Sequence, residues 1–169
     1  MLKNKVKYIL LGSFLSMMIR NAEAQYTTGV GVRIGGTSGV ALKHFYRPGM
    51  ASEGILGTFG NGFSLTALIE KYAPVYEAPG LYVYYGGGAH LAIYDGSGSY
   101  RNNFGREVDY HKKNELGFGV NGVIGAEYRL PDHIPIAFSL ELKPFLEVSS
   151  GGNTSFAADP AIGVKFIIR

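Results

Sequence analysis

Charged side chains alternate with apolar ones along much of this chain. The clearest run is residues 136–148, where Leu140 and Leu142 alternate with Glu141 and Lys143. A period of two places such charges together on one face of a β-strand. If that face is enclosed, the charges can form a plug of salt bridges or a path for protons or ions. We favour the plug, in which opposite charges such as Glu141 and Lys143 neutralise each other, because an unpaired buried charge is costly.

The same alternation predicts which residues face the interior. The polar network expected there is Arg33, Lys43, Glu53, Glu70, His90, Glu127, Arg129, Glu141, Lys143 and Lys165. His90 is a candidate general base, but no serine lies two residues from it, so a role as a polar filler is preferred. His44, His111 and His133 are scattered without metal-ligand spacing. We therefore predict no catalytic residue, no metal site and no cofactor.

Two other stretches of the sequence could indicate a function. Residues 117–122, GFGVNG, match the dinucleotide-binding fingerprint by letter, but they lie inside a predicted strand with no helix after it. These glycines are expected to relieve crowding inside a small barrel. Residues 95–115 mix aromatic with charged side chains, which suits either a surface-binding loop or a solvated hairpin extension. The sequence leaves these two readings of 95–115 equal.

Eight strands account for the alternation, joined by turns rich in Gly, Pro and Asn. They are expected at 26–35, 39–46, 51–58, 63–71, 81–94, 116–130, 136–148 and 157–168. An even number of consecutive long strands predicts an all-β, antiparallel, up-and-down sheet. Open sheet edges are costly in lipid, so a membrane-spanning sheet must close. The prediction is an eight-stranded transmembrane β-barrel over 25–169, with connections at 72–80 and 131–135 and outer loops at 95–115 and 149–155.

The first 24 residues have the features of a cleaved signal peptide. Lys3, Lys5 and Lys7 precede an apolar core at 9–19, and Ala22-Glu-Ala24 provides a cleavage site. The alternative is an ordinary buried N-terminal helix. Cleavage would remove four of the 16 basic and one of the 13 acidic residues, which leaves 12 of each. A neutral mature chain gives no reason to expect a nucleic-acid partner.

Several segments resemble the small OmpA-like and OmpX-like outer-membrane β-barrels, and above all the β-barrel domain proteins of Bacteroidota. The segments are 53–56 (EGIL), 79–90 (PGLYVYYGGGAH), 122–128 (GVIGAEY) and 140–145 (LELKPF). Gly163, Phe166 and Ile168 resemble the C-terminal signal that such barrels present for assembly, although Ile168 is not aromatic and Arg169 follows it. The resemblance implies residence in the cell outer membrane, with membrane lipid and the barrel assembly machinery as partners.

The function expected on this basis is a small, monomeric, non-enzymatic outer-membrane barrel. Its role would be structural, or would lie in binding an extracellular ligand through the loops 95–115 and 149–155. One alternative is a lipid-modifying enzyme of the PagP or PagL kind, which would need a Ser, His and carboxylate cluster at the outer rim. Another is a soluble lipocalin-like binder, which would need the polar face outside and an apolar cavity within.

Overall fold

The chain folds into strands only, over the part that the structure describes. The computed structural model describes residues 27–60, 62–95, 98–101, 107–110, 115–130 and 134–168. The strands are β1 (Thr28–Gly35), β2 (Ser38–Arg47), β3 (Met50–Phe59), β4 (Gly62–Pro74), β5 (Leu81–Tyr94), β6 (Gly98–Arg101), β7 (Glu107–Tyr110), β8 (Glu115–Arg129), β9 (Ile136–Ser149) and β10 (Thr154–Ile168). No helix among these residues is long and apolar enough to cross a membrane.

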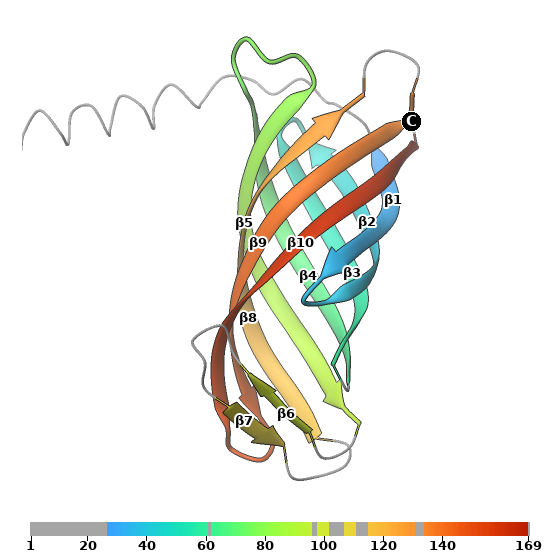
Figure 1. Cartoon of the computed structure of the whole chain (residues 1–169). Coiled ribbons are helices and arrows are strands. Elements are labelled where there is room, and N and C mark those ends of the chain that lie inside the picture. Colours follow the sequence, from blue (N-terminus) through green and yellow to red (C-terminus); the bar gives the residue numbers. More distant parts are fainter. Residues whose placement is uncertain are drawn as a thin grey trace, which may run out of the picture.

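Eight of the strands close into a barrel (Figure 1). Around the barrel the order is β1-β10-β9-β8-β5-β4-β3-β2, and every neighbouring pair is antiparallel. Consecutive barrel strands are neighbours, and the first strand pairs with the last, with Thr28 opposite Ile168. The prediction of an all-β, eight-stranded, up-and-down antiparallel closed barrel is therefore confirmed.

The strands are strongly tilted, as the pairing register shows. One row of partners runs around the barrel through Ile167, Gly29, Lys43, Glu53, Leu68, Gly88, Asn121, Phe145 and Ala157. The row starts on β10 at Ile167 and returns to β10 at Ala157, a stagger of ten residues. With about 3.3 Å per residue and about 4.8 Å between strands, this stagger corresponds to a tilt of about 40°.

Three details differ from the sequence-based prediction. The segment 95–115 contains the strands β6 and β7, which pair with each other as a two-stranded sheet apart from the barrel. β4 continues through Pro74 into the predicted connection at 72–80, and the β9–β10 turn is confined to 150–153. The predicted signal peptide, 1–24, and most of the predicted turn 131–135 lie outside the described residues.

The two faces of the barrel wall have opposite polarity. Side chains such as Val32, Leu42 and Leu140 lie on the outside, and Leu140 is 63% exposed. Lys43, 0% exposed, and Glu53 lie inside. This arrangement is the reverse of a water-soluble fold, in which charged groups cover the surface and are almost never fully buried unless paired.

Candidate functional site: the charged interior of the barrel

Charged side chains from β2, β3, β4 and β10 meet in a cluster inside the barrel. Lys43 Nζ lies 2.7 Å from Glu70 Oε2 and 3.2 Å from Glu53 Oε2. Lys165 Nζ approaches Glu53 from β10, at 3.1 Å from Oε1. The four side chains come from β2, β3, β4 and β10, and all are buried. Such pairing offsets the cost of desolvating each charge.

Aromatic rings extend this cluster toward the barrel end that holds the strand termini Thr28 and Ile168. Lys43 Nζ donates a hydrogen bond to Tyr72 Oη and lies 4.5 Å from the centre of the Tyr84 ring. Tyr72 Oη in turn donates to Glu127 Oε2 at 3.2 Å, and Arg129 Nε and Nη2 bond Glu127 Oε1, each at 2.9 Å. The polar network is thus continuous from Arg129 to Lys43.

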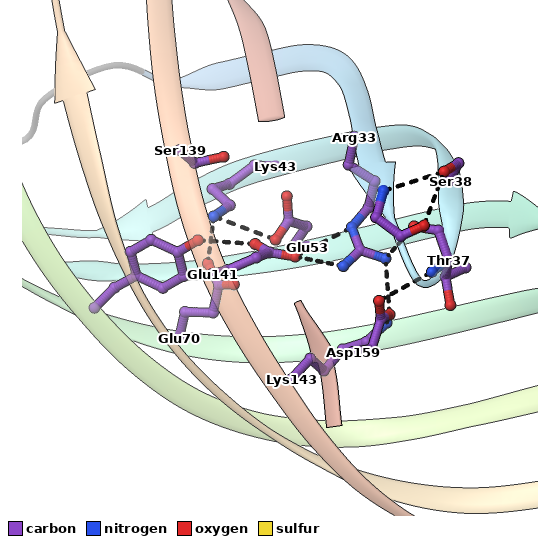
Figure 2. Close-up of polar contacts among 12 residues, drawn as sticks. Arg33, Thr37, Ser38, Lys43, Glu53, Glu70, Ser139, Glu141, Lys143 and Asp159 are labelled. Atoms are coloured by element: carbon purple, nitrogen blue, oxygen red, sulfur yellow. Dashed lines mark hydrogen bonds and ion pairs between the residues drawn. The ribbon is translucent and has the colours of Figure 1, made fainter. Parts of the chain in front are cut away.

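A second cluster surrounds Arg33 (Figure 2). Arg33 Nη2 lies 2.8 Å from Glu141 Oε1, and its Nη1 lies 3.2 Å from Asp159 Oδ2. Asp159 also accepts a hydrogen bond from the Thr37 backbone N–H at 2.9 Å and pairs with Lys143 at 3.2 Å. This pairing corrects one expectation from the sequence. Glu141 and Lys143 were expected to neutralise each other, but Glu141 is bound by Arg33, and Lys143 is bound to Asp159.

A third cluster lies toward the opposite end, where β5 and β8 approach the 95–115 segment. His90 Nε2 is 2.8 Å from Glu147 Oε2, and His90 Nδ1 is 2.7 Å from Asn121 Oδ1. Tyr94 Oη donates to the other oxygen of Glu147. Both ring nitrogens of His90 are therefore engaged by side-chain oxygens. A general base needs a free ring nitrogen within reach of a nucleophile or water, and this geometry offers none.

Glu115 completes the interior at the same end. Its Oε1 accepts hydrogen bonds from Ser149 Oγ and from the Gly151 backbone N–H, the latter at 2.9 Å. These bonds tie the start of β8 to the turn between β9 and β10. Among the described residues, five buried Lys and Arg side chains face seven buried Asp and Glu side chains. The two acidic side chains in excess are Glu115 and Glu147, so the barrel end near 95–115 is more acidic than the other end.

All ten residues named from the sequence lie inside the barrel and are buried: Arg33, Lys43, Glu53, Glu70, His90, Glu127, Arg129, Glu141, Lys143 and Lys165. They fall into the three clusters rather than into one site. Sequence reasoning omitted several members of the network, namely Tyr72, Tyr84, Tyr94, Glu115, Asn121, Glu147 and Asp159. The alternation could have identified Asp159, because it lies six residues before Lys165 and therefore on the same face of the strand.

The residues of the C-terminal motif divide between the two faces of β10. Phe166 and Ile168 are exposed on the outside of the barrel. Gly163 faces inward, opposite Arg33 in β1 and Ser139 in β9. A Cβ atom at Gly163 would contact Ser139 Oγ, so the glycine leaves room for the neighbouring strand's side chain.

The interior holds no group of three or more His, Cys, Asp or Glu arranged to bind a metal, within the ranges that the structure covers. No protein-family model matches the chain, and comparison with curated proteins gives no significant match. Of the resemblance inferred from the sequence, the structure shows the closed eight-stranded antiparallel barrel and no more. The function has to be argued from the barrel itself.

Proposed function

We propose that this protein is a small, monomeric, non-enzymatic barrel of a Gram-negative outer membrane. Its role is structural, or lies in binding at the cell surface through the segments 95–115 and 149–155. The observation that carries the proposal is the polarity of the wall, which has an apolar outside and paired charges inside. Lipid is the solvent in which that arrangement is favourable.

The apolar band has the height that a bilayer requires. The outward aromatic residues Tyr128 and Phe118 on β8 lie ten residue steps apart, as do Phe166 and Phe156 on β10, and Leu116 and Ile168 continue the apolar face by one outward position. At about 3.3 Å per residue and a tilt of about 40°, ten residues rise about 25 Å. That is the height of the lipid-facing band in outer-membrane barrels, which aromatic residues border at both interfaces. The aromatic residues at the ends of these two strands fit that description.

The alternatives receive less support from the interior. A lipid-modifying enzyme of the PagP or PagL kind needs an activated nucleophile, whereas both nitrogens of His90 are occupied. A lipocalin-like binder needs an apolar cavity and a polar exterior, and this barrel has the reverse polarity. The acidic end near 95–115, where the β6–β7 hairpin lies apart from the barrel, is the better candidate for contact with other molecules.

Membrane residence can be tested directly. After expression in a Gram-negative host, the protein should sediment with outer membranes, resist carbonate extraction and migrate faster in SDS gels before boiling than after it. Faster migration before boiling reports a barrel that resists SDS. A protein recovered in the soluble periplasm, with one mobility, would contradict the proposal.

Export predicts a specific processing event. N-terminal sequencing of the membrane-extracted protein should start at Gln25, because Ala22 and Ala24 are the small residues of the cleavage site. Ala24→Arg removes one of these small residues and should leave a larger, uncleaved precursor. A wild-type protein that still starts at Met1 would refute the signal peptide.

A further inference from the structure

The outside of the barrel carries a group of polar side chains on β1 to β4, at the end that holds Thr28. On β5, β8 and β9, the outward positions are apolar, aromatic, proline or glycine throughout. On β1 to β4, by contrast, Thr28, His44, Ser52 and Lys71 alternate with the inward charges. His44, Ser52 and Lys71 are exposed and Thr28 is half-buried. We call these four residues the outer polar patch.

The pairing register holds the patch together. Thr28 is opposite His44, and His44 is opposite Ser52, so the three form one straight row across β1, β2 and β3. Thr28 Oγ1 lies 3.1 Å from His44 Nδ1, and Ser52 Oγ donates to the His44 backbone oxygen at 3.4 Å. Lys71 lies one diagonal position from Ser52, because it is opposite Met50. Residues on neighbouring strands at diagonal positions lie within reach of long side chains.

The patch is basic. Arg47, at the end of β2, is also opposite Met50 and is exposed. Neither Arg47 nor Lys71 forms an ion pair with another residue of the described ranges, and His44 uses only Nδ1 there. The acidic residues of these strands, Glu53 and Glu70, point into the barrel. The outside of β1 to β4 thus carries uncompensated positive charge with hydroxyl groups beside it.

With the barrel placed in a membrane as proposed, the patch lies at the level of an interface. Tyr46 is two residues further along β2, and Tyr128, Phe138 and Phe166 mark the same end of the barrel on β8, β9 and β10. Tyrosine rings and basic side chains are characteristic of the headgroup region. Ammonium, hydroxyl and imidazole groups are suitable partners for a phosphate diester, and lysine near a membrane surface attracts anionic lipid.

We propose that the outer polar patch binds the phosphate of an anionic phospholipid in the leaflet at the barrel end that holds Thr28 and Ile168. This inference rests on the proposed membrane residence. A second copy of the chain is the less suitable occupant. A symmetric contact through this face would bring Lys71 and Arg47 of both copies together without an acidic partner, and like charges at an interface are repulsive.

The test measures lipid selectivity in reconstituted protein. Wild type, Lys71→Gln, the double variant His44→Gln with Lys71→Gln, and the control Thr58→Val are placed in phosphatidylcholine nanodiscs with a minor fraction of phosphatidylglycerol. Thr58 is a matched control because it is also polar, outward-facing and on β3, but at the other end of the strand. Native mass spectrometry then counts the lipid retained by each protein. A parallel arm adds inorganic phosphate as a competitor.

Wild type and Thr58→Val should retain phosphatidylglycerol over phosphatidylcholine. Lys71→Gln should lower the preference roughly fivefold, the ratio expected for one lysine near an anionic surface, and the double variant should abolish it. Millimolar phosphate should not displace the lipid, since the acyl chains also contribute to binding. Four outcomes would overturn the inference while leaving membrane residence intact. The inserted, heat-modifiable wild type could lack the preference, or the patch variants could keep it. Phosphate could displace the lipid, or the protein could form a dimer. Failure to insert would instead refute membrane residence, and the lipid site with it.

Discussion

At the level of single residues, some of the interior pairs act across strands that are not neighbours. Arg33 on β1 is bound to Glu141 on β9, although β10 lies between these two strands. Lys165 on β10 is bound to Glu53 on β3 in the same way. A slip of one residue in any strand would carry its charges to the apolar outside. The pairs therefore specify register as well as offsetting burial.

The Arg33 cluster gives a prediction that distinguishes its pairs. Glu141→Gln should lower the free energy of unfolding by roughly 1.5–3 kcal/mol, because it removes a charged acceptor from Arg33 and Tyr84. Adding Arg33→Met should recover part of that loss, since no unpaired cation remains and Asp159 keeps Lys143. Adding Lys143→Met instead should recover less, because Arg33 then stays buried without its closer partner and keeps only Asp159. Urea unfolding in lipid vesicles would measure all three variants, and a larger recovery with Lys143→Met than with Arg33→Met would contradict the pairing described.

The alternation in the sequence was enough to assign residues to a face, but not to choose partners. Period two places Glu141 and Lys143 on the same side of one strand, which made them look like a pair. The observed partners come from β1 and β10, whose relation to β9 depends on barrel closure and on the ten-residue stagger. Neither the closure of the barrel nor its stagger can be predicted from the sequence of a single strand. The same limit explains why Tyr72, which lay in a predicted connection, was not recognised as a member of the network.

At the level of strands, glycine allows close approach where β4, β5 and β8 pack. A Cβ atom at Gly88 would clash with the backbone oxygen of Ala67, and glycine avoids this clash because it has no side chain. Backbone atoms of a central strand cannot move aside cheaply. A Cβ atom at Gly54, on the outside of β3, would meet nothing within 4 Å.

This contrast predicts opposite behaviour for two identical substitutions. Gly88→Ala should destabilise the barrel by roughly 1–3 kcal/mol or more, as overpacking does. Gly54→Ala should change stability by no more than about 0.5 kcal/mol, or increase it slightly, because alanine restricts the unfolded chain. Thermal and urea unfolding of the two refolded variants would compare them. Equal effects would mean that the β4–β5 register is wrong.

The outward face of β9 gives the second prediction at this scale. Leu140 is 63% exposed among other apolar residues, so Leu140→Arg should cost roughly 2–4 kcal/mol if that face contacts hydrocarbon. The control is Tyr76→Arg, in the turn between β4 and β5, where the side chain is 91% exposed. It should change stability by less than about 0.5 kcal/mol. A loss below about 1 kcal/mol at Leu140, measured by refolding into vesicles, would argue against a lipid-facing band.

The sequence predicted the positions of the barrel strands more accurately than the residues at which they begin and end. The eight barrel strands lie within a few residues of their predicted limits, because alternation is strong over ten or more positions. β6 and β7 were not predicted as strands, since four-residue segments rich in polar groups carry too little periodicity. The start of β10 at Thr154, before the predicted 157, was missed because Thr154 and Ser155 continue the polar run that was assigned to the loop 149–155.

At the scale of the whole molecule, the interior is occupied by side chains from all eight barrel strands. Lys43, Glu70, Tyr84 and Glu127 are among the largest fully buried side chains. An eight-stranded barrel is just wide enough to be filled in this way. Purified protein should therefore give no porin-sized conductance steps in planar bilayers, with a known porin as the positive control. Stable large steps would revive the ion-path hypothesis.

Because Thr28 in the first strand pairs with Ile168 in the last, the barrel is a closed ring of strands, and its first and last residues are neighbours in space. A short linker could join these two residues, and the chain could be reopened between Phe59 and Gly62, at the turn that connects β3 to β4. Such a circular permutant would retain every strand pair of the barrel, yet Gly163, Phe166 and Ile168 would now lie in the middle of the polypeptide. Spontaneous refolding of the permutant into vesicles would require only the finished ring. If the proposed assembly signal has to lie at the C-terminus, delivery of the permutant to the outer membrane of cells would fail, and the two requirements would be separated.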